Sequence, residues 1–303
     1  MAPLSPEIAV ASGWHRQAYR RVLVGYAFIL PWVIGFLLFK AYPIGASFYI
    51  SLHQWDLLKP PIYVEFENYV RLSRDPLFWT SLLNTLYYAL CVPLRLVLAL
   101  ALAMLLNRSW PGINAARALL YLPSATPVAV IAVVWTLMYH PTFGAVNTIF
   151  GYAAIRGPKW IASPEWAMPA LIFMSLWYVG PMMVIFLAGL KGIPSVLYEA
   201  AAIDGASAWN QFKNITLPVV SPVILLNLVM DIILAFQVFA SIYIMTGGGP
   251  MNRTLVLALY IYQHAFVWLN MGYASALAWG LFLLTFGLTL AQMRVSKRWV
   301  FYQ

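Results

Sequence analysis

Charged residues are scarce in this sequence. Only 9% of its 303 residues are Asp, Glu, Lys or Arg, whereas 63% are hydrophobic, and the mean hydropathy is +0.79. Soluble domains average about 25% charged residues. So few charges cannot cover a surface that faces water, and no polar block is long enough for a separate soluble domain. We therefore expect one integral membrane domain over residues 1–303.

Cysteine and the common catalytic motifs are also missing. Cys91 is the only cysteine, which excludes an intrachain disulfide and a cysteine metal cluster. No Gly precedes a Lys, so the chain has no phosphate loop for ATP, and neither H-E-x-x-H nor G-x-S-x-G occurs. The histidines lie far apart, at positions 15, 53, 140 and 264. A membrane-embedded enzyme thus lacks a catalytic constellation, and we expect no catalytic residue, no metal site and no cofactor bound by this chain.

The net charge of +9 would suggest nucleic acid as the partner of a soluble protein. Here the basic residues lie mainly at the ends of apolar segments, where they anchor topology. We therefore expect contact with membrane lipid and not with nucleic acid.

Six apolar stretches are long enough to cross a bilayer, since roughly 20 helical residues span its hydrocarbon core. They cover approximately residues 22–39, 81–106, 118–139, 167–190, 219–244 and 271–292. A shorter apolar stretch, at about 255–268, is predicted to be an interfacial helix. The expected fold class is an all-α integral membrane protein with six transmembrane helices.

The first apolar stretch follows Arg16, Arg20 and Arg21, a pattern that a signal peptide would share. The stretch is 18 residues long and no small-residue cleavage pattern follows it closely. We interpret it as a retained first span.

Lys and Arg are distributed unevenly between the two sides of the predicted membrane. If both termini are cytoplasmic, ten lie in cytoplasmic segments and seven in outer segments, and Arg95 lies within a span. This bias favours cytoplasmic termini and places residues 191–218 in the cytoplasm.

Two charged residues lie inside predicted spans, Arg95 in the second and Asp231 in the fifth. Charges in a span are costly and usually face a cavity or a partner. The two residues could pair with each other, Arg95 could extend to an interface, or Asp231 could line a hydrated solute site. Other polar and aromatic side chains in the spans could line the same cavity: Asn84, Tyr87, Ser175, Trp177, Tyr178 and Asn227.

Together these side chains suggest an aromatic-walled pathway for a polyhydroxylated solute, although each alone is more often a helix–helix contact. An anionic cargo such as glycerol phosphate would favour Arg95 as its contact. A neutral sugar would favour Asp231 and the aromatic residues. The sequence leaves both readings open.

The loop at 191–218 has a pattern of its own. Its first half predicts a helix that Asp204 and Gly205 end, because glycine readily adopts a left-handed conformation. Ser207 is a plausible N-cap for a second helix, which Pro218 is expected to end before the fifth span begins. Such a loop could be a rigid helical hairpin that transmits motion to the two spans it joins, or it could simply connect them.

Ten positions in this loop carry a family resemblance across 24 residues: Glu199, Ala200, Ala201, Asp204, Gly205, Ala206, Phe212, Leu217, Pro218 and Pro222. They resemble the cytoplasmic "EAA" loop of permease subunits in binding-protein-dependent ABC importers. The stretches 41–57, 66–88 and 246–254 are similar to the carbohydrate-uptake branch, in particular to the first permease of maltose and glycerol-3-phosphate systems. We expect this chain to be the compact six-span form, without the extra N-terminal spans and the large external domain of the maltose type.

The resemblance implies the six-span type I importer fold, with Glu199–Ala206 as a coupling helix seated in an ATPase subunit. It implies a second homologous permease, two ATP-binding cassette subunits that hold ATP and Mg²⁺, and an extracytoplasmic solute-binding protein. Asp231, Ser175 and Trp177 would fall near the family's mid-membrane solute site. The expected location is a prokaryotic cytoplasmic membrane.

The sequence thus predicts a non-catalytic permease subunit that imports a sugar or related polyol by alternating access. An ion-gradient-driven transporter is the main alternative. It would need coupling carboxylates in the spans and often an inverted repeat, and the sequence offers only Asp231 and no evident repeat.

Overall fold

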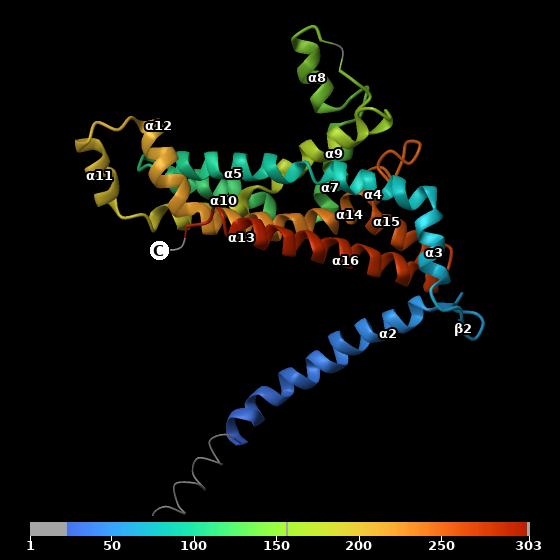
Figure 1. The fold of residues 1–303 in the computed structure, drawn as a ribbon. Helices are drawn as coiled ribbons and strands as arrows, with labels where there is room; N and C mark the ends of the chain where they lie inside the picture. The colour runs from blue at the N-terminus through green and yellow to red at the C-terminus, as the bar shows by residue number, and fades with distance from the viewer. Residues whose placement is uncertain (1–22, 156, 302–303) are drawn as a thin grey trace, which may run out of the picture.

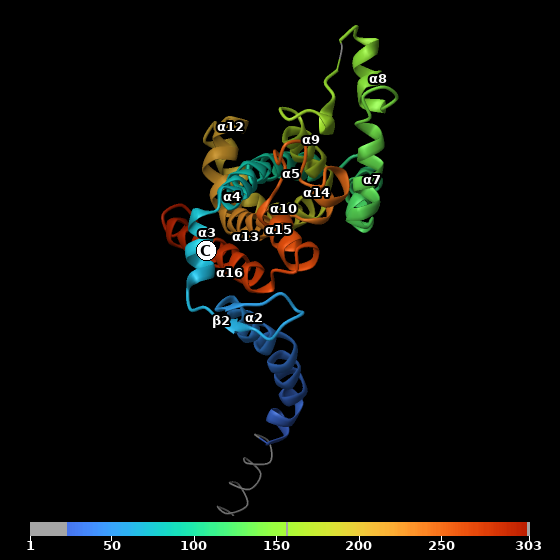
Figure 2. The ribbon, with the colours of Figure 1, turned by 90° about the vertical axis from the view of Figure 1, so that its right-hand side faces the viewer.

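The computed structural model describes residues 23–155 and 157–301, which form a helical bundle with one small two-stranded sheet (Figures 1 and 2). Four helices in this part of the chain are continuous and long and apolar enough to cross a membrane: Leu23–Ser51, Pro76–Leu106, Ala208–Phe236 and Met271–Ser296. Two bent helix pairs raise the number of candidate spans to six if each pair is one span. This architecture belongs to the all-α membrane class that the sequence predicts.

The bent pairs are Ile113–Ala125 with Val128–Met138, bent by 99°, and Ala167–Tyr178 with Gly180–Lys191, bent by 47°. Both breaks lie beside prolines. Pro127 and Pro181 lack the N–H group that would continue the helical ladder, so each can begin a helix but not extend one from the preceding turn.

The elements of the first half, labelled as in Figure 1, are η1 (Leu37–Ala41), α2 (Tyr42–Ser51), β1 (His53–Gln54), β2 (Ile62–Tyr63), α3 (Glu67–Arg74), α4 (Pro76–Tyr88), α5 (Cys91–Leu106), α6 (Ile113–Tyr121), η2 (Leu122–Ala125), α7 (Val128–Met138) and α8 (Ala145–Tyr152). The two strands pair antiparallel, with His53 opposite Tyr63.

The elements of the second half are η3 (Trp160–Ala162), α9 (Ala167–Ser175), η4 (Leu176–Tyr178), α10 (Gly180–Lys191), α11 (Ser195–Ile203), α12 (Ala208–Gln211), η5 (Phe212–Thr216), α13 (Leu217–Phe236), α14 (Ala240–Met245), α15 (Leu257–Tyr262), η6 (Gln263–Val267) and α16 (Met271–Ser296). The apolar stretch predicted at 255–268 is therefore the short helix formed by α15 and η6.

The first helix diverges from the bundle. In Figures 1 and 2 it leaves the other helices at the end of α2 and runs away from them. None of the residues in its most apolar window is buried. Its last turns contact α16, where the Trp279 Nε1 group donates to Ser47 Oγ at 3.2 Å and the Trp279 ring packs edge-on against Phe48. The predicted first span, 22–39, overlaps the start of this helix, and Arg16, Arg20 and Arg21 lie outside the described residues.

Small residues bring the central helices close together. Ala99 and Ala103 of α5 are completely buried in the apolar cluster that joins α5, α10 and α13. A Cβ atom added at Gly189 of α10 would lie 2.8 Å from Val223 Cγ2 of α13. Small residues at such contacts are the usual means of packing helices tightly in a membrane, where the hydrophobic effect does not drive helices together.

The bundle has a helical hairpin at one end and the sheet with α3 at the other (Figure 1). α11 and α12 form the hairpin, and the chain end after α16 lies beside it, since the Phe301 amide donates to Ser221 Oγ at 2.8 Å. With the orientation predicted from Lys and Arg, the hairpin end would be cytoplasmic.

Pro218 does not end the second helix of the hairpin, contrary to the prediction. Residues Ala208–Phe236 form one continuous helix. A π-helical turn at Phe212–Thr216 precedes the proline and inserts one extra residue into the ladder. Pro222 leaves the Pro218 carbonyl without its usual backbone donor, and Ser221 Oγ donates to that carbonyl at 2.6 Å. The helix therefore tolerates two prolines because its wide turn and one serine compensate for them.

Asp75 anchors the end of the bundle that carries the sheet. Its Oδ1 accepts from the Leu77 amide at 2.9 Å, and its Oδ2 accepts from the hydroxyls of Tyr260 at 2.5 Å and Tyr273 at 2.6 Å. Burial would raise the pKa of the Asp75 carboxyl, but these hydrogen bonds outweigh it, and the pKa lies below its usual value. One ionised side chain thus joins the start of α4 to α15 and α16.

Candidate functional site

Three helix interruptions meet at one place within the bundle. They are the break before Val128, the break at Leu176–Tyr178 and the break after Phe236, where Gln237–Phe239 separate α13 from α14. Residues from all three breaks line a cavity of about 350 Å³, together with residues from α4 and α5. Breaks of this kind free backbone polar groups, which is tolerated in a membrane where they line a cavity or are buried in protein.

The cavity wall carries several polar side chains. These are Tyr88, Arg95, Ser175, Tyr178, Gln237 and Ser241. The apolar part of the wall includes Met174, Leu234 and Phe239. A small apolar pocket with a few converging polar groups is the usual form of a small-molecule site, and pockets of roughly 300–1,000 Å³ are typical.

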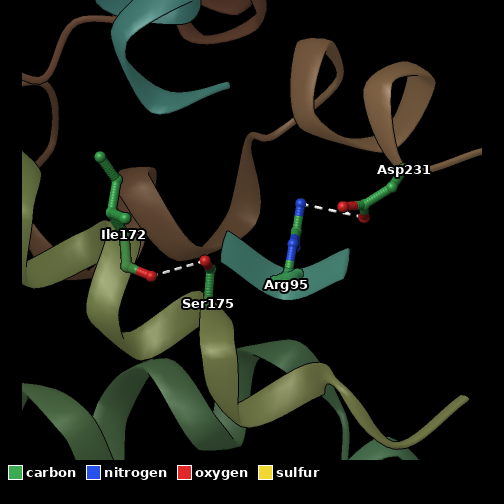
Figure 3. A network of polar contacts seen from close by, with 4 residues as sticks. All are labelled: Arg95, Ile172, Ser175 and Asp231. Atoms are coloured by element: carbon green, nitrogen blue, oxygen red, sulfur yellow. Dashed lines mark hydrogen bonds and ion pairs between the residues drawn. The ribbon is translucent and has the colours of Figure 1, made fainter. Parts of the chain in front are cut away.

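An ion pair lies at the edge of this cavity. Arg95 Nη2 of α5 lies 3.0 Å from Asp231 Oδ1 of α13, and the two side chains are 11% and 7% exposed. Figure 3 shows the guanidinium reaching from α5 toward Asp231. The contact is an ion pair without an aligned hydrogen bond: among the described residues, Arg95 Nε, Arg95 Nη2 and Asp231 Oδ2 have no hydrogen-bond partner. Of the alternatives left open by the sequence, the structure thus has the two charges in contact.

Ser175 and Tyr178 also belong to this cavity, and they differ in how their hydroxyls are used. Ser175 Oγ donates to the Ile172 carbonyl at 2.6 Å, as Figure 3 shows. The Tyr178 hydroxyl is buried and has no hydrogen-bond partner within the described parts of the chain. A buried hydroxyl without a partner is costly, so a hydrogen bond from this group to a solute would be favourable.

Asn84 and Tyr87 line a second, smaller cavity, of about 250 Å³, together with Glu165 and Arg253. The Asn84 side-chain amide donates to the carbonyls of Asn252 at 2.8 Å and Leu255 at 2.9 Å. Asn84 therefore ties α4 to the loop before α15.

Asn227 and Trp177 do not line the first cavity. The Asn227 amide donates to the Val223 carbonyl one turn earlier in its own helix, at 3.1 Å. The Trp177 ring is half exposed and packs edge-on against Trp135. Of the eight predicted pathway residues, the structure thus brings Arg95, Ser175 and Tyr178 together, with Asp231 behind Arg95.

Sequence reasoning did not single out Tyr88 or Ser241 as pathway residues. Tyr88 lies seven positions before Arg95, two helical turns away, so the two share a face if α4 and α5 continue one another. That spacing could have identified Tyr88 in place of Tyr87. No sequence signal marks Ser241, because its place depends on where α13 ends.

The helical hairpin at the other end has the turn that the sequence predicts. α11 ends at Ile203, Gly205 has a φ of +73°, and the Ala206 amide donates back to the Ala201 carbonyl at 2.9 Å. This geometry is a glycine C-cap of the Schellman type. Ser207 Oγ then accepts from the Asn210 amide at 3.3 Å and caps α12.

The residues of the hairpin that the sequence singles out lie mostly on its surface. Glu199, Ala200, Asp204 and Gly205 are exposed, and Ala201, Ala206 and Phe212 are half-buried. The hairpin also exposes apolar side chains, with Ile203 86% exposed and Trp209 67% exposed. Its two arms are joined by a 2.8 Å hydrogen bond between the Tyr198 hydroxyl and Thr216 Oγ1.

A multi-span bundle with broken helices around a small polar cavity, and with an exposed helical hairpin at one end, defines a membrane transport protein. The chain belongs to the family described as the binding-protein-dependent transport system inner membrane component, whose model matches residues 95–300.

Two relatives are similar over nearly the whole chain. The probable ABC transporter permease protein YesP of Bacillus subtilis is 41% identical over 93% of this chain and 93% of its own length. The trehalose/maltose transport system permease protein MalF of Thermococcus litoralis is 35% identical over 92% of this chain and 95% of its own. The chain is therefore an ABC importer permease, a membrane component, and the resemblance of its loop to this family is confirmed.

A solved structure shows the same fold. A bacterial ABC transporter involved in the import of the acidic polysaccharide alginate contains a chain that superposes with a TM-score of 0.81. The match covers 93% of this chain and 98% of that one, at 24% sequence identity. The importer permease fold predicted from the sequence is confirmed.

Proposed function

We propose that this chain is a membrane-spanning half of an ATP-driven importer and moves a sugar or related polyol into the cell by alternating access. The observation that carries the proposal is the exposed hairpin Glu199–Ala206, which joins directly to a helix that borders the cavity. α12, η5 and α13 form one continuous helix from Ala208 to Phe236. A push on the hairpin would therefore reach the cavity without passing through a flexible link.

A sugar as cargo is supported by the cavity and by the family. A trehalose/maltose permease protein is a relative of similar length, at 35% identity. The cavity combines hydroxyl, amide and guanidinium groups with aromatic and apolar walls, which suits a polyhydroxylated solute. A single buried acid, Asp231, gives little support to a path for cations.

The family description supports a soluble binding protein as partner, since it names a binding-protein-dependent system. We infer that an extracytoplasmic binding protein delivers the solute, that a second permease completes the pathway, and that two ATPase subunits bind below. ATP and Mg²⁺ would be held by the ATPase subunits. The unburied first helix supports a second membrane subunit, because its apolar sides are free to pack against one.

The proposed cycle uses the hairpin as a coupling element. Closure of the ATPase subunits on ATP would draw the hairpins of the two permeases together and open the cavity outward. Hydrolysis would return them and open the cavity inward. α13 transmits this motion to Asp231 and so to Arg95 at the cavity wall. The chain would lie in a prokaryotic cytoplasmic membrane with both termini inside. Family membership disfavours the ion-gradient alternative.

Reversal of the charge at Glu199 tests the coupling. We infer that Glu199 meets a basic residue of the ATPase subunit. In Glu199→Lys we therefore expect ATP-driven uptake to fall at least about tenfold, because like charges in a desolvated interface repel strongly. Glu199 is an exposed position of α11, so the permease should insert in normal amounts. Uptake in cells and the amount of permease in membranes are the measurements.

The matched control is Glu65→Lys, the same charge change on the exposed loop before α3 at the other end of the bundle. It should leave uptake near the wild-type rate. Normal uptake by Glu199→Lys would remove the hairpin from the coupling role.

A further inference from the structure

The cavity wall is rich in hydrogen-bond donors and carries a positive charge. Among the described residues that line it, Arg95 is the one charged side chain, and no carboxylate joins it. The other polar groups are phenols, serine hydroxyls and the amide of Gln237. A carboxylate in a sugar site accepts hydroxyl protons, and the described part of this wall has none, whereas an anionic group needs donors, for which arginine is the strongest side chain.

Asp231 holds the Arg95 side chain in place without lining the cavity itself. Asp231 contacts Arg95 through a single oxygen, at 3.0 Å from Nη2, and Asp231 is absent from the described cavity lining. The carboxylate therefore orients the guanidinium and offsets part of the cost of burying it. It does not use up the five N–H groups of the guanidinium.

Tyr178 carries a second hydrogen-bond donor. Its side chain lines the same cavity, and its buried hydroxyl has no hydrogen-bond partner among the described residues. Its O–H group and the free N–H groups of Arg95 come from two different spans. Together they could receive the oxygens of one anionic group on a solute.

We propose that the cargo is an acidic saccharide, whose carboxylate is received in the membrane by Arg95 with help from Tyr178. Asp231 is a positioning residue that holds the guanidinium and, by its own negative charge, weakens the hold on the carboxylate. A weak hold suits a transport site, from which the solute must leave in each cycle. This inference rests on the proposed function of the chain as a saccharide importer.

The first test is the cargo preference of the complete importer. Proteoliposomes that contain the permease pair and the ATPases are supplied with the binding protein and with one of two probes. One probe is an oligouronide, and the other is the same oligosaccharide with each carboxyl reduced to a hydroxymethyl group. We expect ATP-dependent uptake of the oligouronide to exceed that of its neutral counterpart at least tenfold.

The outcomes separate this inference from the function on which it rests. Uptake of the neutral counterpart alone, or of both probes equally, would overturn the acidic cargo and leave the importer function intact. Uptake of neither, across oligouronides and their reduced forms, would count against both.

The second test concerns Arg95 itself. The double variant Arg95→Gln/Asp231→Asn removes both charges and so avoids an unpaired buried carboxylate. This double variant should lose at least nine-tenths of the preference for the oligouronide. Arg95→Lys should keep part of that preference. Arg74→Gln, which removes an arginine on α3 outside the cavity, is the matched control and should keep the full preference.

Tyr178→Phe should lower the preference without abolishing it, because it removes one donor and leaves the guanidinium. A double variant that assembles with its ATPases and keeps the wild-type preference would overturn the assignment of Arg95 to the carboxylate.

Discussion

His264 is a buried imidazole inside an aromatic cage near the end of the bundle that carries the sheet. Its ring lies between those of Tyr260, Trp268 and Tyr273, at centroid distances of 4.7, 4.5 and 4.6 Å. Neither ring nitrogen has a hydrogen-bond partner within the described residues. Burial, together with the nearby Arg71, lowers the pKa of His264 to about 4, although the charge of Asp75 acts in the opposite direction.

This histidine should make stability depend on pH. The pKa of a histidine in the unfolded chain is near 6.5. Between about pH 6.5 and 4, His264 is therefore protonated in the unfolded chain but neutral in the folded one. Stability therefore falls as the pH falls through this window, by roughly 2–3 kcal/mol at pH 4.5. In His264→Phe this part of the loss should disappear. Thermal unfolding of the purified protein at pH 7 and pH 4.5 measures it.

Phe266→Leu, an exposed position in the same short helix, is the control and should keep the wild-type pH dependence. Asp75 does not interfere, because its pKa lies below its usual value and its stabilisation is lost only as the pH falls below this window. An unchanged difference between the two pH values in His264→Phe would contradict the prediction.

The ion pair of Arg95 and Asp231 should show a strong coupling in stability. Arg95→Met leaves the Asp231 carboxylate buried without its cation, at a cost of about 3–5 kcal/mol. Adding Asp231→Leu removes that charge as well, and the double variant should recover to within about 1–2 kcal/mol of wild type. Thermal unfolding of the single and double variants gives the coupling energy. Additive losses would show that the two charges do not depend on each other.

At the level of elements, the sequence predicts best where the signal is local. The Asp204-Gly205 turn and the Ser207 cap follow from residue types next to each other in the chain, and the structure forms both. The continuation of the helix through Pro218 could not be predicted in this way. It depends on the π-helical turn at Phe212–Thr216, just before the proline, which has no residue signature of its own.

The residues that line the cavity were also harder to predict from the sequence, because most of them are brought together by non-local contacts. Arg95 and Asp231 stand out because a charge in a span is rare. Tyr178, Tyr88 and Ser241 meet only because three helices break at one level of the bundle. Contacts between distant segments decide which helix breaks come together. The hydrophobic periodicity of a single segment contains no information about those contacts.

Gly189 sets the distance between α10 and α13. Gly189→Leu would place new atoms against Val223, whose Cγ2 lies only 2.8 Å from a built Cβ. Overpacking of this kind costs about 1–3 kcal/mol. Val223→Ala should restore part of the loss in the double variant, because it removes the atoms that clash. Thermal unfolding is the measurement.

Gly287→Leu is the matched control, since a Cβ at Gly287 of α16 meets no atom within 4 Å. It should change stability by less than about 0.5 kcal/mol. A loss as large as that of Gly189→Leu, or no rescue by Val223→Ala, would show that the close approach of α10 and α13 does not limit the substitution.

At the scale of the whole molecule, the first helix leaves a large apolar surface uncovered. This helix, Leu23–Ser51, carries bulky apolar side chains that no other part of the described chain covers, with Phe28 82% and Trp32 70% exposed. It touches the bundle near its end, at α16 and, through Ser51, at α3 (Figure 2). A helix held at one end and uncovered along its length is placed to pack against a neighbouring membrane subunit.

Thiol labelling of this helix tests that arrangement. Phe28→Cys and Trp32→Cys place a thiol on its uncovered part, and the native Cys91 adds little background because it is completely buried. With a membrane-permeant maleimide, at least one of the two positions should be labelled several-fold more slowly in the assembled importer than in the permease alone, since a helix packed on a partner excludes the reagent. Labelling after denaturation in SDS gives the total thiol as reference. Equal rates at both positions, with and without the partner subunits, would mean that the helix faces lipid throughout and that the second permease binds elsewhere on the bundle.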